Sequence, residues 1–207
     1  MSAPTTTTPA EPRDSSVRHL LSALMYTVIT VIALGIIYPV VIWAIASVVF
    51  PHAAGGSLIV VDGKVIGSEL VGQNFAKPGY FQGRPSAAGK GYDPTSTGGT
   101  NFGATSKKLI DATRTTIAAL KKANPDAPGE VPMDLVTSSA SGIDPDISPE
   151  GAAYQIPRVA HARSLPISRV QALVEAHTMP RMLGVFGEPH VNVLELNRAL
   201  DAQGASR

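Results

Sequence analysis

Cysteine is absent from this 207-residue sequence. The absence excludes disulfide bonds, thiolate metal sites and cysteine nucleophiles. An excess of charge of either sign is also missing, since 17 basic residues face 16 acidic ones. Nucleic-acid-binding proteins usually present a clustered basic face, so this balance gives no reason to expect a nucleic acid as partner.

Charged side chains are missing altogether from residues 20–50, a run of 31 residues. About 20 helical residues cross a bilayer core of about 30 Å, so the run predicts a transmembrane helix. Pro39 removes one backbone hydrogen bond and predicts a kink, which membrane helices tolerate. A cleaved signal peptide is the alternative, with Ala44-Ile45-Ala46 as the cleavage-like site. Signal cores span only about 7–15 residues, which favours the uncleaved anchor.

The flanks of the uncharged run predict its direction. Residues 1–19 are rich in Thr, Pro and Ser and nearly devoid of apolar side chains, which predicts a disordered tail. Arg13 and Arg18 precede the run, whereas the first basic residue after it is Lys64. Lys and Arg flanking a span favour the cytoplasmic side. We therefore expect a cytoplasmic N-terminus and an extracytoplasmic domain over residues 51–207.

The pattern of residues 51–207 predicts one α+β domain with a small sheet and several helices. Asp62-Gly63 between two short apolar runs predicts a β-hairpin with a type I′ turn. Apolar residues at helical spacing predict a helix over residues 106–123. Ser148-Pro149-Glu150 predicts the start of another, reaching about Arg163. Four further expectations are a short helix over residues 68–75, a strand over 133–136, a capping box at Ser168 and a cap at Asn192 before a final helix.

Residues 76–105 contain repeated Gly and Pro breakers and no periodic pattern. A segment of this length without regular structure is either disordered or an ordered functional loop. Aromatic side chains favour order because they can attach the loop to a core; they are Tyr80, Phe81, Tyr92 and Phe102.

Motifs for independent catalysis or metal binding are incomplete. Residues 83–91 approach a P-loop, but the spacing is wrong and Gly91 replaces the required hydroxyl residue, so a flexible turn is favoured. Asp144-Pro145-Asp146 offers too few oxygens for a calcium cage and suits a turn. The five histidines are scattered, which argues against a zinc site. Arg158 and Arg163, on the predicted helix, are expected to face water.

A series of motifs between residues 20 and 200 resembles one family. The motifs are Gly35-Ile36-Ile37-Tyr38-Pro39, Tyr80-Phe81-Gln82-Gly83-Arg84-Pro85-Ser86, Gly99-Thr100-Asn101-Phe102-Gly103, residues 136–149 and Ala152-Ala153-Tyr154-Gln155-Ile156-Pro157-Arg158. Together they resemble the C subunits of bacterial Kdp-type potassium-transporting ATPases.

The resemblance implies an accessory, non-catalytic subunit in a bacterial inner-membrane pump. Its implied partners are a channel-like potassium-binding subunit, a P-type ATP-hydrolysing subunit and a small single-helix subunit, besides the lipid bilayer. The family is also described as a catalytic chaperone that raises the ATP affinity of the P-type subunit. The positions implied for a nucleotide are Gln155 and, in a stretch faintly like an ABC-ATPase signature, Ser138, Ser139, Ser141 and Gly142.

The expected orientation conflicts with a direct nucleotide role, because ATP is cytoplasmic while these residues are expected outside. We therefore expect the domain to brace the outer face of the channel-like subunit and to affect ATP only indirectly. Two alternatives remain open. One is a tethered hydrolase that uses the Ser138–Ser141 hydroxyls, although no Gly-x-Ser-x-Gly context surrounds them. The other is a ligand receptor built on residues 95–105.

Overall fold

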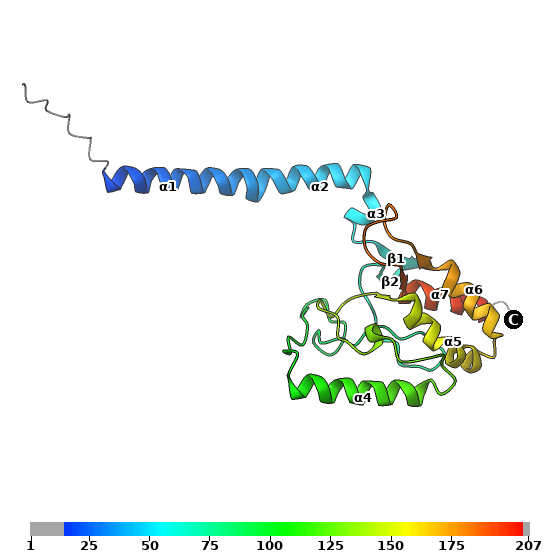
Figure 1. Cartoon of the computed structure of the whole chain (residues 1–207). Helices are drawn as coiled ribbons and strands as arrows, with labels where there is room; N and C mark the ends of the chain where they lie inside the picture. The colour runs from blue at the N-terminus through cyan, green and yellow to red at the C-terminus, as the bar shows by residue number, and fades with distance from the viewer. Residues whose placement is uncertain (1–14, 205–207) are drawn as a thin grey trace, which may run out of the picture. The chain divides into compact units, whose positions relative to one another are not determined.

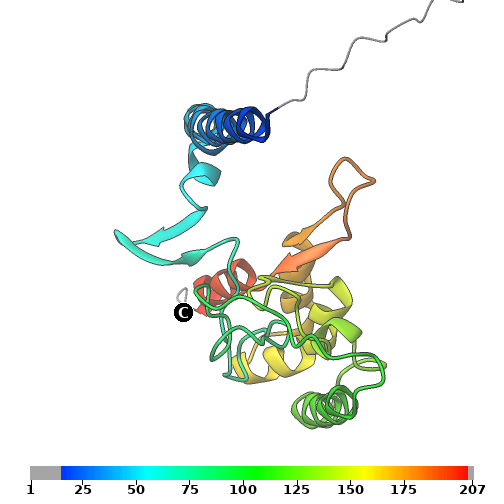
Figure 2. The same cartoon turned by 90° about the vertical axis from the view of Figure 1, so that its left-hand side faces the viewer.

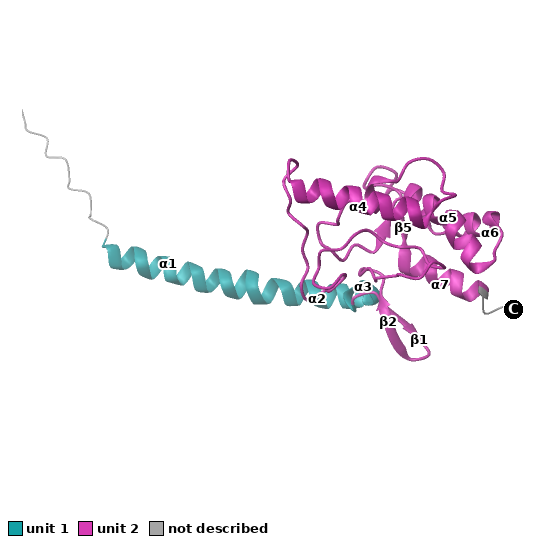
Figure 3. Ribbon diagram, turned by 90° about the horizontal axis from the view of Figure 1, so that it is seen from below, with its two compact units in different colours: residues 1–55 teal, residues 56–207 magenta. Residues whose placement is uncertain are grey.

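The computed structural model describes residues 15–204, so most of the predicted tail lies outside the described residues. The chain divides into two compact units, Met1–Gly55 and Gly56–Arg207 (Figure 3).

The described part of the first unit is a long apolar helical segment followed by one short helix (Figure 1). It comprises α1 (Ser16–Thr30), the π-helical η1 (Val31–Ile37), α2 (Tyr38–Val49) and the short α3 (Pro51–Ala54). Residues Ser16–Val49 form a candidate membrane span of 34 residues, with a mean hydropathy of 2.6 over its most apolar window. Helix α1 thus starts at Ser16 and includes Arg18 and His19, which the sequence analysis assigned to the tail.

Pro39 affects the helix through its missing N–H. A carbonyl four residues before a proline receives no α-helical hydrogen bond, and the backbone must adjust locally. The adjustment here is the π-helical segment, at whose end the Tyr38 N–H donates to the Ala33 carbonyl five residues earlier. The interruption predicted from Pro39 therefore takes the form of a changed hydrogen-bond register.

The second unit begins with the predicted β-hairpin. Strands β1 (Leu58–Val61) and β2 (Lys64–Ser68) are antiparallel. Asp62 and Gly63 between them have φ of 50° and 75°. Positive φ at both central residues is the requirement of a type I′ turn, so the predicted turn is confirmed.

A three-stranded antiparallel sheet and three helices surround the core. The strand order is β3 (Asp146–Ile147), β5 (His190–Asn192) and β4 (Thr178–Met179). Helices α5 (Pro149–Arg163), α6 (Ile167–Ala176) and α7 (Val193–Gly204) supply most of the buried side chains. Phe81, from the segment without regular structure, is fully buried among them. The predicted α+β class is confirmed as mixed helices and small antiparallel sheets.

Two of the remaining helix predictions are confirmed. Helix α4 (Lys107–Ala123) occupies the predicted range. The Asn192 side chain accepts a hydrogen bond from the Glu195 N–H at the start of α7, as its predicted capping role requires.

Three local predictions are wrong. Residues 68–75 form no helix, because long-range bonds engage them instead: the Gly72 N–H donates to the Ile143 carbonyl. Met133–Leu135 is a 3-10 turn (η2) rather than a strand, because the N–H groups of Val136 and Thr137 donate back to the Met133 carbonyl. Helix α6 starts at Ile167, directly after Pro166, so Ser168 lies inside the helix instead of capping it.

The cap of α5 gives a matched stability test. The Ser148 hydroxyl accepts from the Gly151 N–H at 2.8 Å, whereas Ser106 before α4 makes no capping bond. Ser148→Ala should lower the free energy of unfolding by about 1 kcal/mol because a helix-terminal donor loses its acceptor. Ser106→Ala should cost under about half as much. Urea unfolding of both variants measures the difference, and equal costs would contradict the cap.

Candidate functional site

Side-chain amides hold an extended segment that has no strand beside it. The Phe81 N–H donates to Asn197 Oδ1 at 2.8 Å, and Asn197 Nδ2 donates to the Phe81 carbonyl at 2.9 Å. Asn197 is buried on α7 and only 1% exposed. One amide thus replaces the two hydrogen bonds that a neighbouring strand would supply.

Gln155 makes the same pair of bonds to the next residue. Its Oε1 accepts from the Gln82 N–H at 2.8 Å, and its Nε2 donates to the Gln82 carbonyl at 3.0 Å. Nε2 also donates to the Gly151 carbonyl, and Oε1 also accepts from Arg158 Nη2 at 2.7 Å. Gln155 is fully buried. All its polar atoms are therefore engaged inside the domain.

Two arginines of α5 extend this attachment and correct a prediction. Arg158 donates to the carbonyls of Pro78 and Tyr80 and to Asn124 Oδ1. Arg163 donates to the Gly79 carbonyl, pairs with Asp201 at 2.8 Å and stacks its guanidinium over the Tyr80 ring. We expected both arginines to face water, but bare backbone carbonyls in the unpaired segment hold them instead. Burial lowers the pKa of Arg158.

Residues 138–142 form a tight turn whose hydroxyls bond within the domain. Ser139 Oγ lies 3.1 Å from Ser141 Oγ and accepts from the Gly142 N–H. Ser141 Oγ accepts from the Ile143 N–H, and Ser138 Oγ donates to the Ser139 carbonyl. In the described part of the chain, no histidine or carboxylate bonds to these hydroxyls, so no base is placed to activate them.

Close packing leaves no room for a side chain at Gly142. Its φ is +72°, and a Cβ added there would lie 2.7 Å from both the Ala88 Cβ and the Gly98 carbonyl oxygen. Two hydrogen bonds also join the turn to the segment over residues 76–105. The Ser86 hydroxyl donates to the Gly142 carbonyl, and the Gly98 N–H donates to the Ser141 carbonyl. Gly142 thus permits the turn and the loop to touch.

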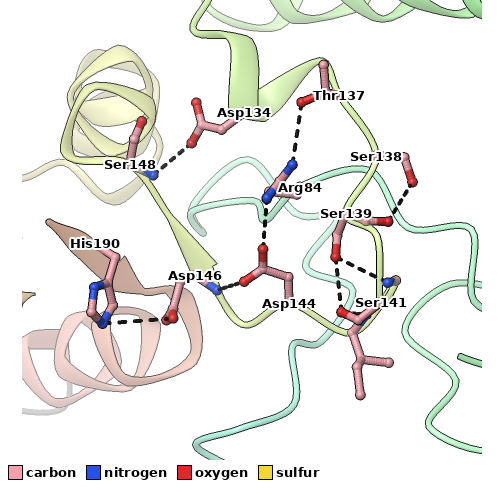
Figure 4. A network of polar contacts seen from close by, with 12 residues as sticks. Arg84, Asp134, Thr137, Ser138, Ser139, Ser141, Asp144, Asp146, Ser148 and His190 are labelled. Atoms are coloured by element: carbon pink, nitrogen blue, oxygen red, sulfur yellow. Dashed lines mark hydrogen bonds and ion pairs between the residues drawn. The ribbon is translucent and has the colours of Figure 1, made fainter. Parts of the chain in front are cut away.

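An ion pair beside the turn links it to the central sheet (Figure 4). Arg84 Nη1 lies 2.9 Å from Asp144 Oδ2, and Asp144 Oδ1 accepts from the Asp146 N–H. Burial raises the pKa of Asp146, which lies 3.9 Å from His190. Burial, together with the nearby Asp144, also raises the pKa of Tyr92 to about 12, and the Tyr92 hydroxyl donates to the Arg84 carbonyl.

The sequence-derived site residues all attach to one segment. Gln155 holds residue 82, and the 138–142 turn holds residues 85, 86 and 98. No hydrogen bond joins Gln155 to the turn among the described residues. Asn197 was not among the predicted site residues, although a polar residue at an inward position of the α7 pattern could have indicated it.

Together, these features define a class of protein: an α+β domain preceded by one long apolar helix that is consistent with a membrane anchor. A comparison with known protein families agrees with this class and identifies one family within it. The family model described as the c chain of the K⁺-transporting ATPase (KdpC) matches residues 20–202.

Three relatives illustrate the extent of the similarity. The chain is 55% identical over 169 residues to a potassium-transporting ATPase KdpC subunit of Dechloromonas aromatica, covering 81% of this chain and 88% of the relative. A KdpC subunit of Nitratidesulfovibrio vulgaris is 53% identical over 82% of this chain and 87% of its own length. One of Ralstonia nicotianae is 50% identical over 95% of this chain and 97% of its own length. The chain belongs to the KdpC family of potassium-transporting ATPase subunits.

Proposed function

We propose that this chain is the accessory subunit that assembles and stabilises an ATP-driven potassium pump, bracing the channel-like subunit from the extracytoplasmic side. The chain's place in the KdpC family carries the proposal. Its partners are then the channel-like subunit, the P-type subunit and the small single-helix subunit, with hydrolysis of ATP in the P-type subunit.

The bonding of the candidate nucleotide residues supports an indirect effect on ATP. Gln155 is fully buried and its amide bonds to Gln82, Gly151 and Arg158. Gly142 has no room for another atom on its Cα. A nucleotide contact at either position would first have to break these internal contacts. An indirect route through the partner subunits requires no such rearrangement.

An exposed apolar loop supports a role within an assembly. The connection between β4 and β5 stands away from the helices of the second unit (Figure 2, orange). Met182, Leu183, Val185 and Phe186 in this loop are 71%, 82%, 68% and 63% exposed. Monomeric soluble proteins rarely gather such side chains on their surface, whereas subunits do so where a partner covers them.

Deleting the gene tests the assembly role. We expect cells without this chain to lose potassium uptake in potassium-limited medium, and the remaining subunits to fall apart during mild detergent extraction. Uptake that persists, together with an intact complex of the other subunits, would overturn the proposal.

The orientation is tested separately, and the missing cysteines make this simple. Ala118→Cys on α4 and Thr5→Cys in the N-terminal segment each introduce one thiol into a cysteine-free chain. Because Arg13 and Arg18 favour the cytoplasm, an impermeant maleimide should label Ala118→Cys in intact spheroplasts and Thr5→Cys only after lysis. Labelling in detergent controls for access. The reverse pattern would place the domain inside and revive a direct nucleotide role.

A further inference from the structure

An open cavity of about 630 Å³ lies between helix α4 and the segment without regular structure. Its walls include Arg84, Lys90 and Tyr92 from that segment and Thr115, Thr116 and Leu120 from α4. Small-molecule sites typically measure about 300–1,000 Å³ and carry a few polar groups on largely apolar walls. The cavity has the size of such a site but a more polar lining, and neither Gln155 nor residues 138–142 line it.

The charged residues that line this cavity are all cationic, although Asp144, outside the lining, pairs with Arg84. Two cationic residues, Arg84 and Lys90, line it, and no Asp or Glu does. The near-neutral total charge conceals a segregation along the chain. Residues 73–123 hold eight of the 17 basic residues but only two of the 16 acidic ones, a formal charge of +6 against −5 for the rest. A cleft lined by one sign of charge concentrates ions of the other sign.

Several donors at the cavity have no acceptor within residues 15–204. Lys90 makes no ion pair or hydrogen bond there, and the Thr116 hydroxyl makes no hydrogen bond. Arg84 Nε is buried without a partner, although Asp144 accepts from its Nη1. A buried donor without an acceptor is costly. An oxyanion in the cavity would supply acceptors to Lys90 and Thr116 through charge-assisted hydrogen bonds, and to Arg84 Nε after a shift of the Arg84 side chain.

We propose that this cavity binds a phosphate group through Arg84, Lys90 and Thr116. The phosphate could come from an anionic phospholipid head group, which the membrane anchor keeps at high local concentration, or from a soluble phosphate compound. The proposed assembly role neither requires nor supplies this site. The two ideas therefore stand or fall separately.

Protection of the Lys90 amine from acylation measures phosphate binding directly. The full-length chain in neutral detergent is titrated with inorganic phosphate, and lysine acylation rates are read by mass spectrometry. The same chain is also placed in nanodiscs of phosphatidylcholine alone or with phosphatidylglycerol. Shielding of Lys90, with Lys108 unchanged, is expected. Shielding by phosphate in detergent assigns a soluble source, and shielding only in phosphatidylglycerol nanodiscs assigns the lipid head group.

Charge variants test whether the cavity, rather than diffuse charge, is responsible. Lys90→Gln should weaken binding about tenfold, because one charge-assisted hydrogen bond is lost. Lys108→Gln removes an equal charge from exposed α4 outside the cavity and should change affinity less than about twofold. Thr116→Glu should abolish binding by repulsion, whereas Ala118→Glu, at an exposed position of α4 that does not line the cavity, should not.

Three results would overturn the proposal. Equal losses in Lys90→Gln and Lys108→Gln would show non-specific attraction. No shielding of Lys90 by phosphate or phosphatidylglycerol would show that the cavity is no phosphate site. Shielding by an oligoglutamate peptide but by neither phosphate source would assign the cavity to an acidic protein segment. Circular dichroism of each variant confirms that it is folded.

Discussion

Replacing Gln155 by leucine should destabilise the domain by about 3 kcal/mol. The substitution keeps a buried side chain of similar size but removes both partners of the Gln82 backbone, bonded at 2.8 Å and 3.0 Å. Each buried polar group left without a partner costs about 1–3 kcal/mol. Arg158 also loses an acceptor. Urea unfolding of the full-length chain in detergent, followed by circular dichroism, measures the loss.

Gln171→Leu is the matched control for this variant. Gln171 lies on α6, is exposed, and bonds only to Glu175 four residues later. Its replacement should change the free energy of unfolding by no more than about 0.5 kcal/mol. In hydrogen exchange, Gln155→Leu should also accelerate the amide of Gln82 far more than amides of α6. If the two variants were equally stable, the amide of Gln155 would contribute nothing to holding the segment.

Gly142→Ala should destabilise the domain by more than about 3 kcal/mol. An alanine with φ near +72° is strained by about 1–2 kcal/mol. In addition, its Cβ would meet the backbone and side chain of Ala88 and the carbonyl of Gly98 within 2.8 Å. Backbone atoms cannot move aside as a flexible side chain can, so the turn and the loop must separate.

Gly129→Ala separates the cost of backbone strain from the cost of the steric overlap. Gly129 has nearly the same φ, +71°, but nothing lies within 4 Å of an added Cβ. It should cost only the backbone strain, about 1–2 kcal/mol. The same urea titration compares both variants. Equal costs would mean that the loop yields without penalty and that Gly142 is there only for its backbone conformation.

Local signals in the sequence predicted much of the fold but little of what holds the site. The uncharged run, Asp62-Gly63, Ser148 and Asn192 each act through neighbours a few residues away, and the long helix, the turn and the two caps agree with the structure. The order in residues 76–105 comes from partners such as Asn197, 116 residues from Phe81. No local pattern reports such a pairing. For the same reason Arg158 and Arg163 were expected at the surface.

The family resemblance came from motifs, and the comparisons agree with it. The roles of individual residues are a different matter. Gln155 and residues 138–142 stay hypotheses as nucleotide positions, and the structure gives each a sufficient role in packing. A motif can persist because it builds the fold, so its presence alone does not identify a binding site.

The side-chain hydrogen bonds that hold residues 81 and 82 also affect the order in which the domain folds. The two amides that make them come from α7 and α5, which lie 116 and 73 residues further along the chain. Contacts that close such large loops form slowly, because the entropy of closure comes before any compensating bond. We expect this stretch to dock only after both helices are in place. Until then Phe81 stays in solvent, so the folding chain passes through a stage in which its central aromatic residue is uncovered.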